Sequence, residues 1–571
     1  MSLRTRALRS LGLVSFLVAL GACTPEKPAV TPDGTPTAKP DATAKPDAPK
    51  GPDAYAAAGP FAEETFATVE TAPLAAGALP FPFPGDRGGV GPAPAVCTDY
   101  LKNKPIAPAA CGDAKSALAA LDQALQVVNA DSPATQEMLN KSRDAKLAGL
   151  ESCAALPAGL VRALRVELSP AGCGDVLAEP ILKAPPKDLR ADVHEALYGL
   201  ALAAKLSRAS AGLPKLDPPF TKARVEKFTN DALAKWMKST ATAIEGLAGD
   251  ASKLHFYGGA VAAVASGVAD LGLVDAVRSA PIPDEYEKDE ERKNIYYGEL
   301  DQRLEPRKNR GRDAALVGLK KFAEVGAIAD GRVHEARRLL SKLYGGRRID
   351  ALDRLLFPQA PSATAATLEE RLALALPTFY FGVLVDAAVV KQPGVLKVLA
   401  TRGVPMPHRK ALHEGGLSPE AAEMEAWAHL ALGRTYWRAT DFEEAARALT
   451  QSPPAERTPA NKLLAALAMG LRGGPKDAAE MMLKLPFGMN AHGQRAALDK
   501  LASEGTPLSG AAAFDAAYLM EIAAPEKADG LFFKSLAKRY AAAADLLTDA
   551  SEKAEAQARA KAAEAIAPHV N

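Results

Sequence analysis

The sequence has almost no net charge and few aromatic residues. Its 571 residues include 69 Lys and Arg against 68 Asp and Glu, a formal charge of +1, which excludes the strongly basic surface of a dedicated nucleic-acid-binding protein. Aromatic residues make up 6% of the chain and hydrophobic residues 48%, so alanine supplies much of the apolar content. Alanine favours helices and is depleted in strands, and the sequence lacks sustained alternation of apolar and polar residues. We therefore predict an all-α protein.

Catalytic and metal-binding motifs are missing as well. The sequence contains no phosphate-binding Gly-x-x-x-x-Gly-Lys loop, no Gly-x-Gly-x-x-Gly turn between a strand and a helix, and no Gly-x-Ser-x-Gly elbow. His194-Glu195 and His334-Glu335 begin like the helix of zinc proteases, but neither is followed by the second histidine. We expect both histidines to be partly exposed helix residues, and we predict no cofactor and no metal site. Asp and Glu are too numerous to single out a catalytic pair, so a hydrolase remains an alternative.

The N-terminus has the layout of an export signal. Arginines at positions 4, 6 and 9 precede a short apolar stretch at 11–20, and Leu20-Gly21-Ala22-Cys23 follows directly. These four residues resemble the lipobox of bacterial lipoproteins, which implies that Cys23 is lipidated and becomes the mature N-terminus. Thr24 in the next position resembles the sorting signal for the outer membrane of Gram-negative bacteria, on its periplasmic or surface face. The alternative is an ordinary secretory signal with a chance cysteine.

A proline-rich segment follows the cysteine. Between residues 23 and 60 prolines alternate with Lys, Asp, Thr and Ala, and the sequence Ala-Lys-Pro-Asp-Ala occurs at 38–42 and again at 44–48. No apolar periodicity interrupts the prolines, so we predict an extended or disordered linker. Such a linker would hold the folded part away from the lipid.

The four remaining cysteines indicate disulfides in an oxidising compartment. They are Cys97, Cys111, Cys153 and Cys173. We predict the pairs Cys97–Cys111 and Cys153–Cys173, because each closes a local loop and because Cys-Gly-Asp occurs at both 111 and 173. Other connectivities and four free thiols remain alternatives, whereas a zinc site is disfavoured because no Cys-x-x-Cys spacing occurs.

One stretch resembles the tetratricopeptide repeat, a 34-residue unit of two helices. The residues that match its order and spacing are Leu430, Leu432, Gly433, Tyr436, Asp441, Phe442, Glu443, Glu444, Ala445 and Leu449. In this resemblance Gly433 lets the two helices approach, Tyr436 and Phe442 fill the space between them, and Ala445 lies at the crossing. Asp441 can cap the second helix.

A second, weaker match to the repeat pattern follows the first. Leu467, Ala468, Leu471, Ala479 and Leu483 repeat part of the pattern 34 to 35 residues on. Helix pairs at 333–356 and 492–523 are further candidates. We therefore predict stacked helical hairpins, a tetratricopeptide-like α-solenoid, after the disordered linker. The uncharged stretch 257–269 is shorter than a membrane span and is predicted as a core helix.

The chain divides into five predicted segments. They are a signal peptide at 1–22, the lipidated cysteine and linker at 23–60, a cysteine-containing helical domain at 61–215, a helical middle domain at 216–400 and a tetratricopeptide-like domain at 401–571.

Two surfaces are candidates for binding a partner. An acidic run at 284–291 precedes a basic run that includes Arg303, Arg307 and Arg310, and internal pairing of these charges is the main alternative to docking. The second surface is the first helix of the repeat, with candidates Trp427, His429 and Trp437.

The sequence therefore favours a lipid-anchored envelope protein that acts as a non-catalytic scaffold. A groove between stacked hairpins would bind a protein or peptide partner, with no role for nucleic acid. An envelope hydrolase acting on glycan or peptide, with a helical positioning domain, is one alternative. An inert structural surface lipoprotein is the other.

Overall fold

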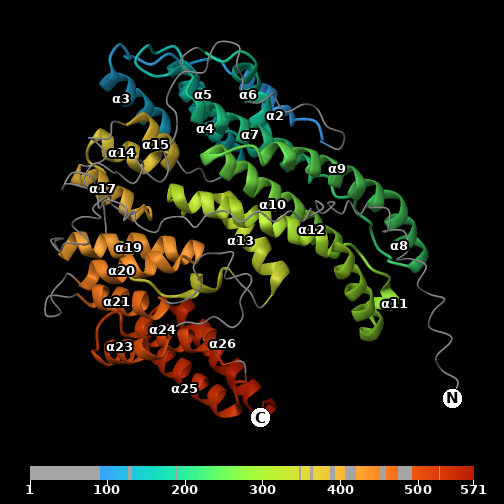
Figure 1. Cartoon of the computed structure of the whole chain (residues 1–571), viewed down its shortest axis with the longest axis vertical. Coiled ribbons are helices and arrows are strands. Elements are labelled where there is room, and N and C mark those ends of the chain that lie inside the picture. The colour runs from blue at the N-terminus through green and yellow to red at the C-terminus, as the bar shows by residue number, and fades with distance from the viewer. Residues whose placement is uncertain are drawn as a thin grey trace, which may run out of the picture.

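The computed structural model describes residues 90–126, 132–186, 189–345, 349–360, 364–385, 392–404, 419–450, 458–472, 491–525 and 527–570 (Figure 1). Across these ranges the chain forms helices joined by short turns and no β-strand, which confirms the predicted all-α class. The signal peptide, Cys23 and the proline-rich linker lie outside the described residues, as do Ala479 and Leu483.

The N-terminal helices form a layer that two disulfides connect. Its helices are α2 (Ala95–Leu101), α3 (Ala114–Leu125), α4 (Pro133–Leu150), α5 (Ala158–Glu167), α6 (Gly174–Lys183) and α7 (Ala191–Ala209). Helix α4 begins as its sequence suggests, with Pro133 in its first turn and the Ser132 hydroxyl accepting a hydrogen bond from the Thr135 amide at 3.2 Å.

The disulfide connectivity differs from the prediction. Cys97 is bonded to Cys173, with Cα atoms 5.2 Å apart, and Cys111 is bonded to Cys153, with Cα atoms 5.6 Å apart. The predicted pairs Cys97–Cys111 and Cys153–Cys173 are therefore wrong. The reason is that α3 and α4 pack as a hairpin, which brings the residues before α3 to those after α4, while α2 packs against α6.

The middle of the chain is built around a long apolar helix. The helices here are α8 (Lys222–Phe228), α9 (Ala234–Ala251), α10 (Phe256–Arg278), α11 (Asp284–Glu287), α12 (Glu290–Val325) and α13 (Gly331–Tyr344). Helix α10 is 23 residues long and is the one described helix long and apolar enough to cross a membrane, but 67% of its most apolar window is buried. Gly267 shows how closely it packs, since a Cβ there would lie 2.5 Å from the Ala315 amide nitrogen of α12. The predicted core helix is thus confirmed, and it is longer than 257–269.

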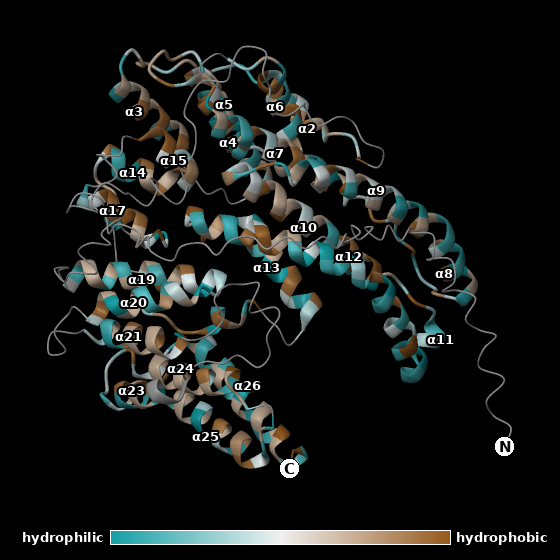
Figure 2. Ribbon diagram, in the orientation of Figure 1, coloured by the Kyte–Doolittle hydropathy of each residue, from teal (hydrophilic) through white to brown (hydrophobic). Residues whose placement is uncertain are grey.

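The C-terminal third is a stack of helices. It contains α14 (Leu368–Ala375), α15 (Thr378–Leu384), α17 (Pro393–Thr401), α19 (Pro419–Tyr436), α20 (Ala439–Thr450), α21 (Pro459–Leu471), α23 (Ala491–Ser503), α24 (Ser509–Ile522), α25 (Gly530–Leu546) and α26 (Ala550–Ile566). From α19 to α26 each described helix packs on the next one along the chain, and Figure 2 shows hydrophobic residues distributed through this stack. The predicted pair at 492–523 is present as α23 and α24. In the pair at 333–356 the second element is only a 3-10 turn, Ala351–Arg354.

The helices share one apolar core. A single cluster of buried hydrophobic residues extends from Cys97 to Ala563. It crosses the predicted boundaries at 215 and 400, so the N-terminal, middle and C-terminal helices stabilise one another by burial.

Candidate functional site

Four residues singled out in the helix pair α19–α20, Gly433, Tyr436, Phe442 and Ala445, are buried or closely packed. A Cβ on Gly433 would lie 2.5 Å from Cε1 of Phe442, so only glycine permits this approach. Tyr436, Phe442 and Ala445 are buried, and the Tyr436 hydroxyl donates a hydrogen bond to the Ala327 carbonyl, which follows α12. The expected cap is the exception: α20 begins at Ala439, so Asp441 lies inside its first turn and does not precede it.

His429 lies in a buried cluster of charges and not on a free surface. Its Nδ1 is 2.9 Å from Oδ1 of Asp441, and its Nε2 is 3.2 Å from Oε1 of Glu425. Arg438 contacts the second oxygen of Asp441 at 2.9 Å. Burial opposes the charged imidazole, but hydrogen bonds to Asp441 and Glu425 raise the pKa of His429 to about 10. At neutral pH His429 is therefore a paired cation that joins α19 to α20.

Trp437 is buried, so it is not a contact for a partner. Its side chain belongs to the largest fully buried ones, with 1% exposed, and its indole Nε1 donates a hydrogen bond to the Ile349 carbonyl at 2.7 Å. Helix α19 ends at Tyr436, and Trp437 has a φ of +54°, in the left-handed region. Trp437 therefore does not continue α19, and its side chain enters the core. Trp427 remains on α19, half-buried against the core.

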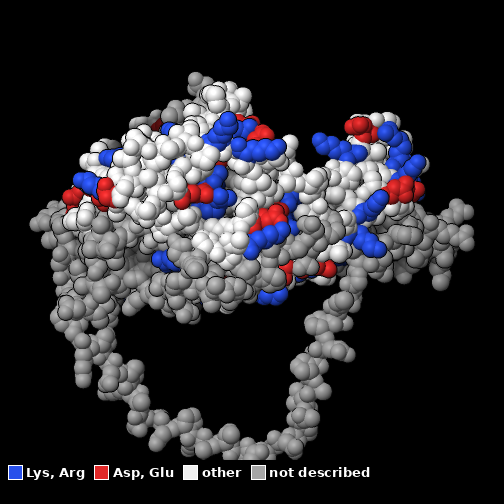
Figure 3. All heavy atoms as spheres, turned by 90° about the horizontal axis from the view of Figure 1, so that it is seen from above, with Lys and Arg blue, Asp and Glu red and all other residues white. Residues whose placement is uncertain are grey.

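The basic run on α12 is mostly paired inside the molecule. Arg307 and Arg310 both bind Asp270 of α10, at 2.7 Å each, and both also contact Glu245 of α9. Asp270 is 1% exposed, so these arginines compensate a buried charge. These arginines are thus paired inside the molecule, but with Asp270 and Glu245 and not with the acidic run at 284–291. Arg303 is exposed, and on the face shown in Figure 3 acidic and basic groups of the described residues lie intermixed.

A projecting segment carries the acidic run. Helix α11 has no buried residue, and the first buried residue of α12 is Leu300. We call residues 284–299 the arm; Figure 1 shows it at the right, away from the C-terminal stack. On the arm Ile295 is 53% exposed, and the rings of Tyr286 and Tyr297 lie 6.4 and 5.4 Å from the ring of Tyr296. Ile295 is thus exposed among acidic side chains, whereas the three tyrosines are half-buried, and Tyr296 and Tyr297 pack against the core.

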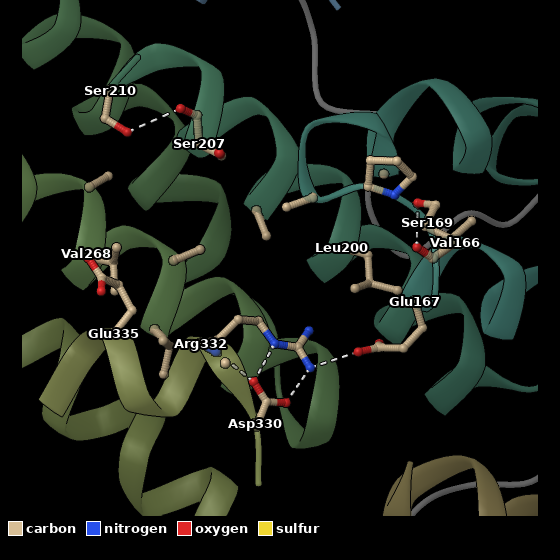
Figure 4. A pocket seen from close by; sticks show the side chains of 18 of the residues that line it. Val166, Glu167, Ser169, Leu200, Ser207, Ser210, Val268, Asp330, Arg332 and Glu335 are labelled. Carbon is tan, nitrogen blue, oxygen red and sulfur yellow. Dashed lines mark hydrogen bonds and ion pairs between the residues drawn. The ribbon is translucent and has the colours of Figure 1, made fainter. Parts of the chain in front are cut away.

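A pocket of about 570 Å³ lies between the N-terminal layer and the middle helices. It is lined by α5, the turn before α6, α7, α10 and the start of α13 (Figure 4). Its walls are largely small apolar side chains; among them are Val166, Leu200, Ala203, Val264, Ala265, Val268 and Ala269. This size and lining are typical of a small-molecule site.

Arg332 joins two carboxylates at one end of the pocket. Its Nη2 lies 2.7 Å from Oε1 of Glu167 and 2.6 Å from Oδ2 of Asp330, and it also donates to the Tyr257 hydroxyl at 3.0 Å. The guanidinium carbon lies 5.3 Å from the centre of the Phe322 ring. Burial opposes the ionised form of Asp330, but Arg332 lowers its pKa. Asp330 is therefore held as a carboxylate and is a poor proton donor.

His194 is fully buried, which corrects the expectation of partial exposure. Neither ring nitrogen has a hydrogen-bond partner among the residues that the structure describes, and burial lowers the pKa of His194 to about 4. Its imidazole is therefore neutral in the helix core. His334 is exposed, as expected. No group of three or more metal-ligating side chains occurs among the described residues.

The pocket is the feature that sequence reasoning missed. Glu167 and Arg332 are 165 positions apart, and no spacing rule connects them. The chain matches no protein-family model, and no curated protein and no solved structure matches it.

Proposed function

We propose that the chain is an exported, lipid-anchored cell-envelope protein that acts as a non-catalytic interaction scaffold. The lipobox-like Leu20-Gly21-Ala22-Cys23 supports an anchor at Cys23, in the outer membrane. Two disulfides are consistent with an oxidising compartment. The stack from α19 to α26, in which each helix packs on its neighbour in the chain, supports a tetratricopeptide-like array.

The observation that carries the scaffold proposal is the arm. An exposed isoleucine beside three half-buried tyrosines presents residue types that are enriched in protein interfaces. The sequence predicted the first repeat helix as the partner surface. This surface is not accessible, because Trp437 is buried and His429 is paired with Asp441. We therefore place the partner surface on the arm and on Arg303 at its base.

The pocket supports binding better than hydrolysis. A glycosidase needs one carboxyl group held protonated as the acid beside a second that stays ionised. Here Glu167 and Asp330 share one nitrogen of Arg332, and the pKa of Asp330 is lowered. Neither feature prepares a general acid.

Photocrosslinking in the native envelope tests the scaffold. A photoreactive amino acid at position 295 should give a discrete crosslinked product, and Arg303→Glu in the same chain should reduce its yield severalfold. The matched control places the same amino acid at Val317, which is 52% exposed on the body of the same helix. Equal products at both positions, or none at 295, would favour the inert surface protein or the hydrolase.

Fatty-acid labelling tests the anchor separately. The wild-type chain should incorporate a labelled fatty acid, and Cys23→Ala should abolish incorporation. Equal labelling of the two chains would remove the lipoprotein proposal and leave the arm experiment unaffected.

A further inference from the structure

The charged side chains around Arg332 in the pocket do not balance. Glu167 and Asp330 supply two carboxylates, and Arg332 supplies one guanidinium. The remaining titratable group in the lining, Glu335, pairs with Arg338 at 2.7 Å. The end of the pocket therefore carries one more negative than positive group. Asp330 is compensated further because it accepts a hydrogen bond from the Arg332 amide at the start of α13. The carboxylate with the least compensation is therefore Glu167, which is 7% exposed, and a cation bound beside it would stabilise it.

Glu167 has an oxygen available for such a cation. Its side chain is 7% exposed, and it lines the pocket (Figure 4). Oε1 accepts the hydrogen bond from Arg332. Oε2 has the Tyr380 hydroxyl at 3.5 Å as its one contact within the described part of the chain, which is the limit of a hydrogen bond. A buried carboxylate oxygen with this little compensation is an acceptor for an ammonium group.

The rest of the pocket lining favours a ligand whose remaining part is apolar. Val166, Leu200, Val264 and Val268 offer no hydrogen bonds from their side chains, and alanines between them leave room for a chain or ring. Burial of apolar surface against these walls would supply most of the binding free energy.

We propose that the pocket binds an amphiphilic organic cation, an apolar body that carries one primary ammonium group, with the ammonium donating to Glu167. Arg332 is a positioning residue, since its bonds to Asp330 and Glu167 fix both carboxylates. A ligand with a carboxylate head is disfavoured, because it would approach two carboxylates that already share the guanidinium. This inference is independent of the scaffold proposal, because the pocket and the arm are built from different residues.

Titration calorimetry with three probes of one chain length tests the charge preference. Octylamine, octanol and octanoate differ only in the head group and are cationic, neutral and anionic at neutral pH. The protein is the full mature chain carrying Cys23→Ala, purified without detergent so that the pocket is not filled by it. Octylamine should bind at least about tenfold more tightly than octanol, as a single partly desolvated charge contact allows, and octanoate should bind most weakly.

Two charge variants identify the acceptor. Glu167→Gln keeps the shape of the side chain and should reduce the affinity for octylamine to that for octanol. Glu335→Gln is the matched control at the same pocket, and it should leave the octylamine preference unchanged because Glu335 is already paired with Arg338. Thermal unfolding of each variant checks that the fold is retained.

A variant that fills the pocket tests whether the probes bind there. Val268→Trp should prevent binding of all three probes, and octylamine should raise the unfolding temperature of the wild-type chain but not of this variant. Tighter binding of octanoate than of octylamine, an octylamine preference that survives Glu167→Gln, unchanged binding to Val268→Trp, or no binding of any probe would each overturn the proposal.

Discussion

Replacing His429 by glutamine should loosen the contact between α19 and α20. The imidazole lies 2.9 Å from Asp441 and 3.2 Å from Glu425, and these two acidic residues are 3% and 2% exposed. Glutamine can still form hydrogen bonds, but it removes the positive charge that the carboxylates share. Removing one partner from a buried ion pair costs about 3–5 kcal/mol, because the remaining charge is left without compensation. We expect a loss of stability in this range.

The pH dependence provides a second measure of the same interaction. The pKa of His429 is about 10 in the folded protein, whereas an unfolded histidine has a pKa of about 6.5. At about 1.4 kcal/mol per pH unit, this difference corresponds to about 5 kcal/mol. Because the folded-state pKa is the higher one, the stabilisation is complete below about pH 6.5 and is lost as the pH rises toward 10.

Hydrogen exchange measured by mass spectrometry resolves the effect in α19 and α20. In the wild-type chain the opening free energy of these two helices should fall between about pH 6 and about pH 9.5. In His429→Gln it should be low at both pH values. His334→Gln, at an exposed histidine of α13, is the control and should leave the exchange of α19 and α20 unchanged. Wild-type protection in His429→Gln, or a wild-type opening free energy that does not depend on pH, would refute this reasoning.

Two further predictions concern the disulfides and the buried indole. Peptide mapping without reduction should recover Cys97 linked to Cys173 and Cys111 linked to Cys153, and a Cys97–Cys111 peptide would contradict the packing of α3 against α4. Trp437→Ala should lower the free energy of unfolding by about 3–5 kcal/mol, because it leaves a cavity and removes the shorter of the two side-chain hydrogen bonds to the Ile349 carbonyl, the other coming from Arg337; a urea midpoint equal to that of the wild-type chain would contradict the burial.

Local patterns predicted the parts of the fold that depend on near neighbours. Gly433 and Phe442 are nine positions apart on adjoining helices, so their contact follows from the geometry of one hairpin. The apolar run containing Gly267 predicted a core helix, because close backbone packing needs small residues. The uncharged stretch is shorter than the helix of 23 residues, because α10 continues through Asp270.

Tertiary contacts decided the features that local patterns missed. Asp270 is tolerated in α10 because Arg307 and Arg310 of α12 compensate it. Trp437 was placed wrongly because a single residue with positive φ changes the direction of its side chain. The pocket needed α5, α7, α10 and α13 together, and its Glu167–Arg332 pair has no counterpart in sequence spacing.

The Cys97–Cys173 bond determines how mechanical load enters the protein. A pull on the chain from its N-terminal end reaches α2 first, at the start of the described helices. At Cys97 the force passes through the covalent bond directly to Cys173, at the start of α6. The 75 residues between them, which include α3, α4 and α5, lie outside the load path. Tension from an N-terminal anchor would therefore act on α6 and the helices it packs against, and α3, α4 and α5 would carry none of it.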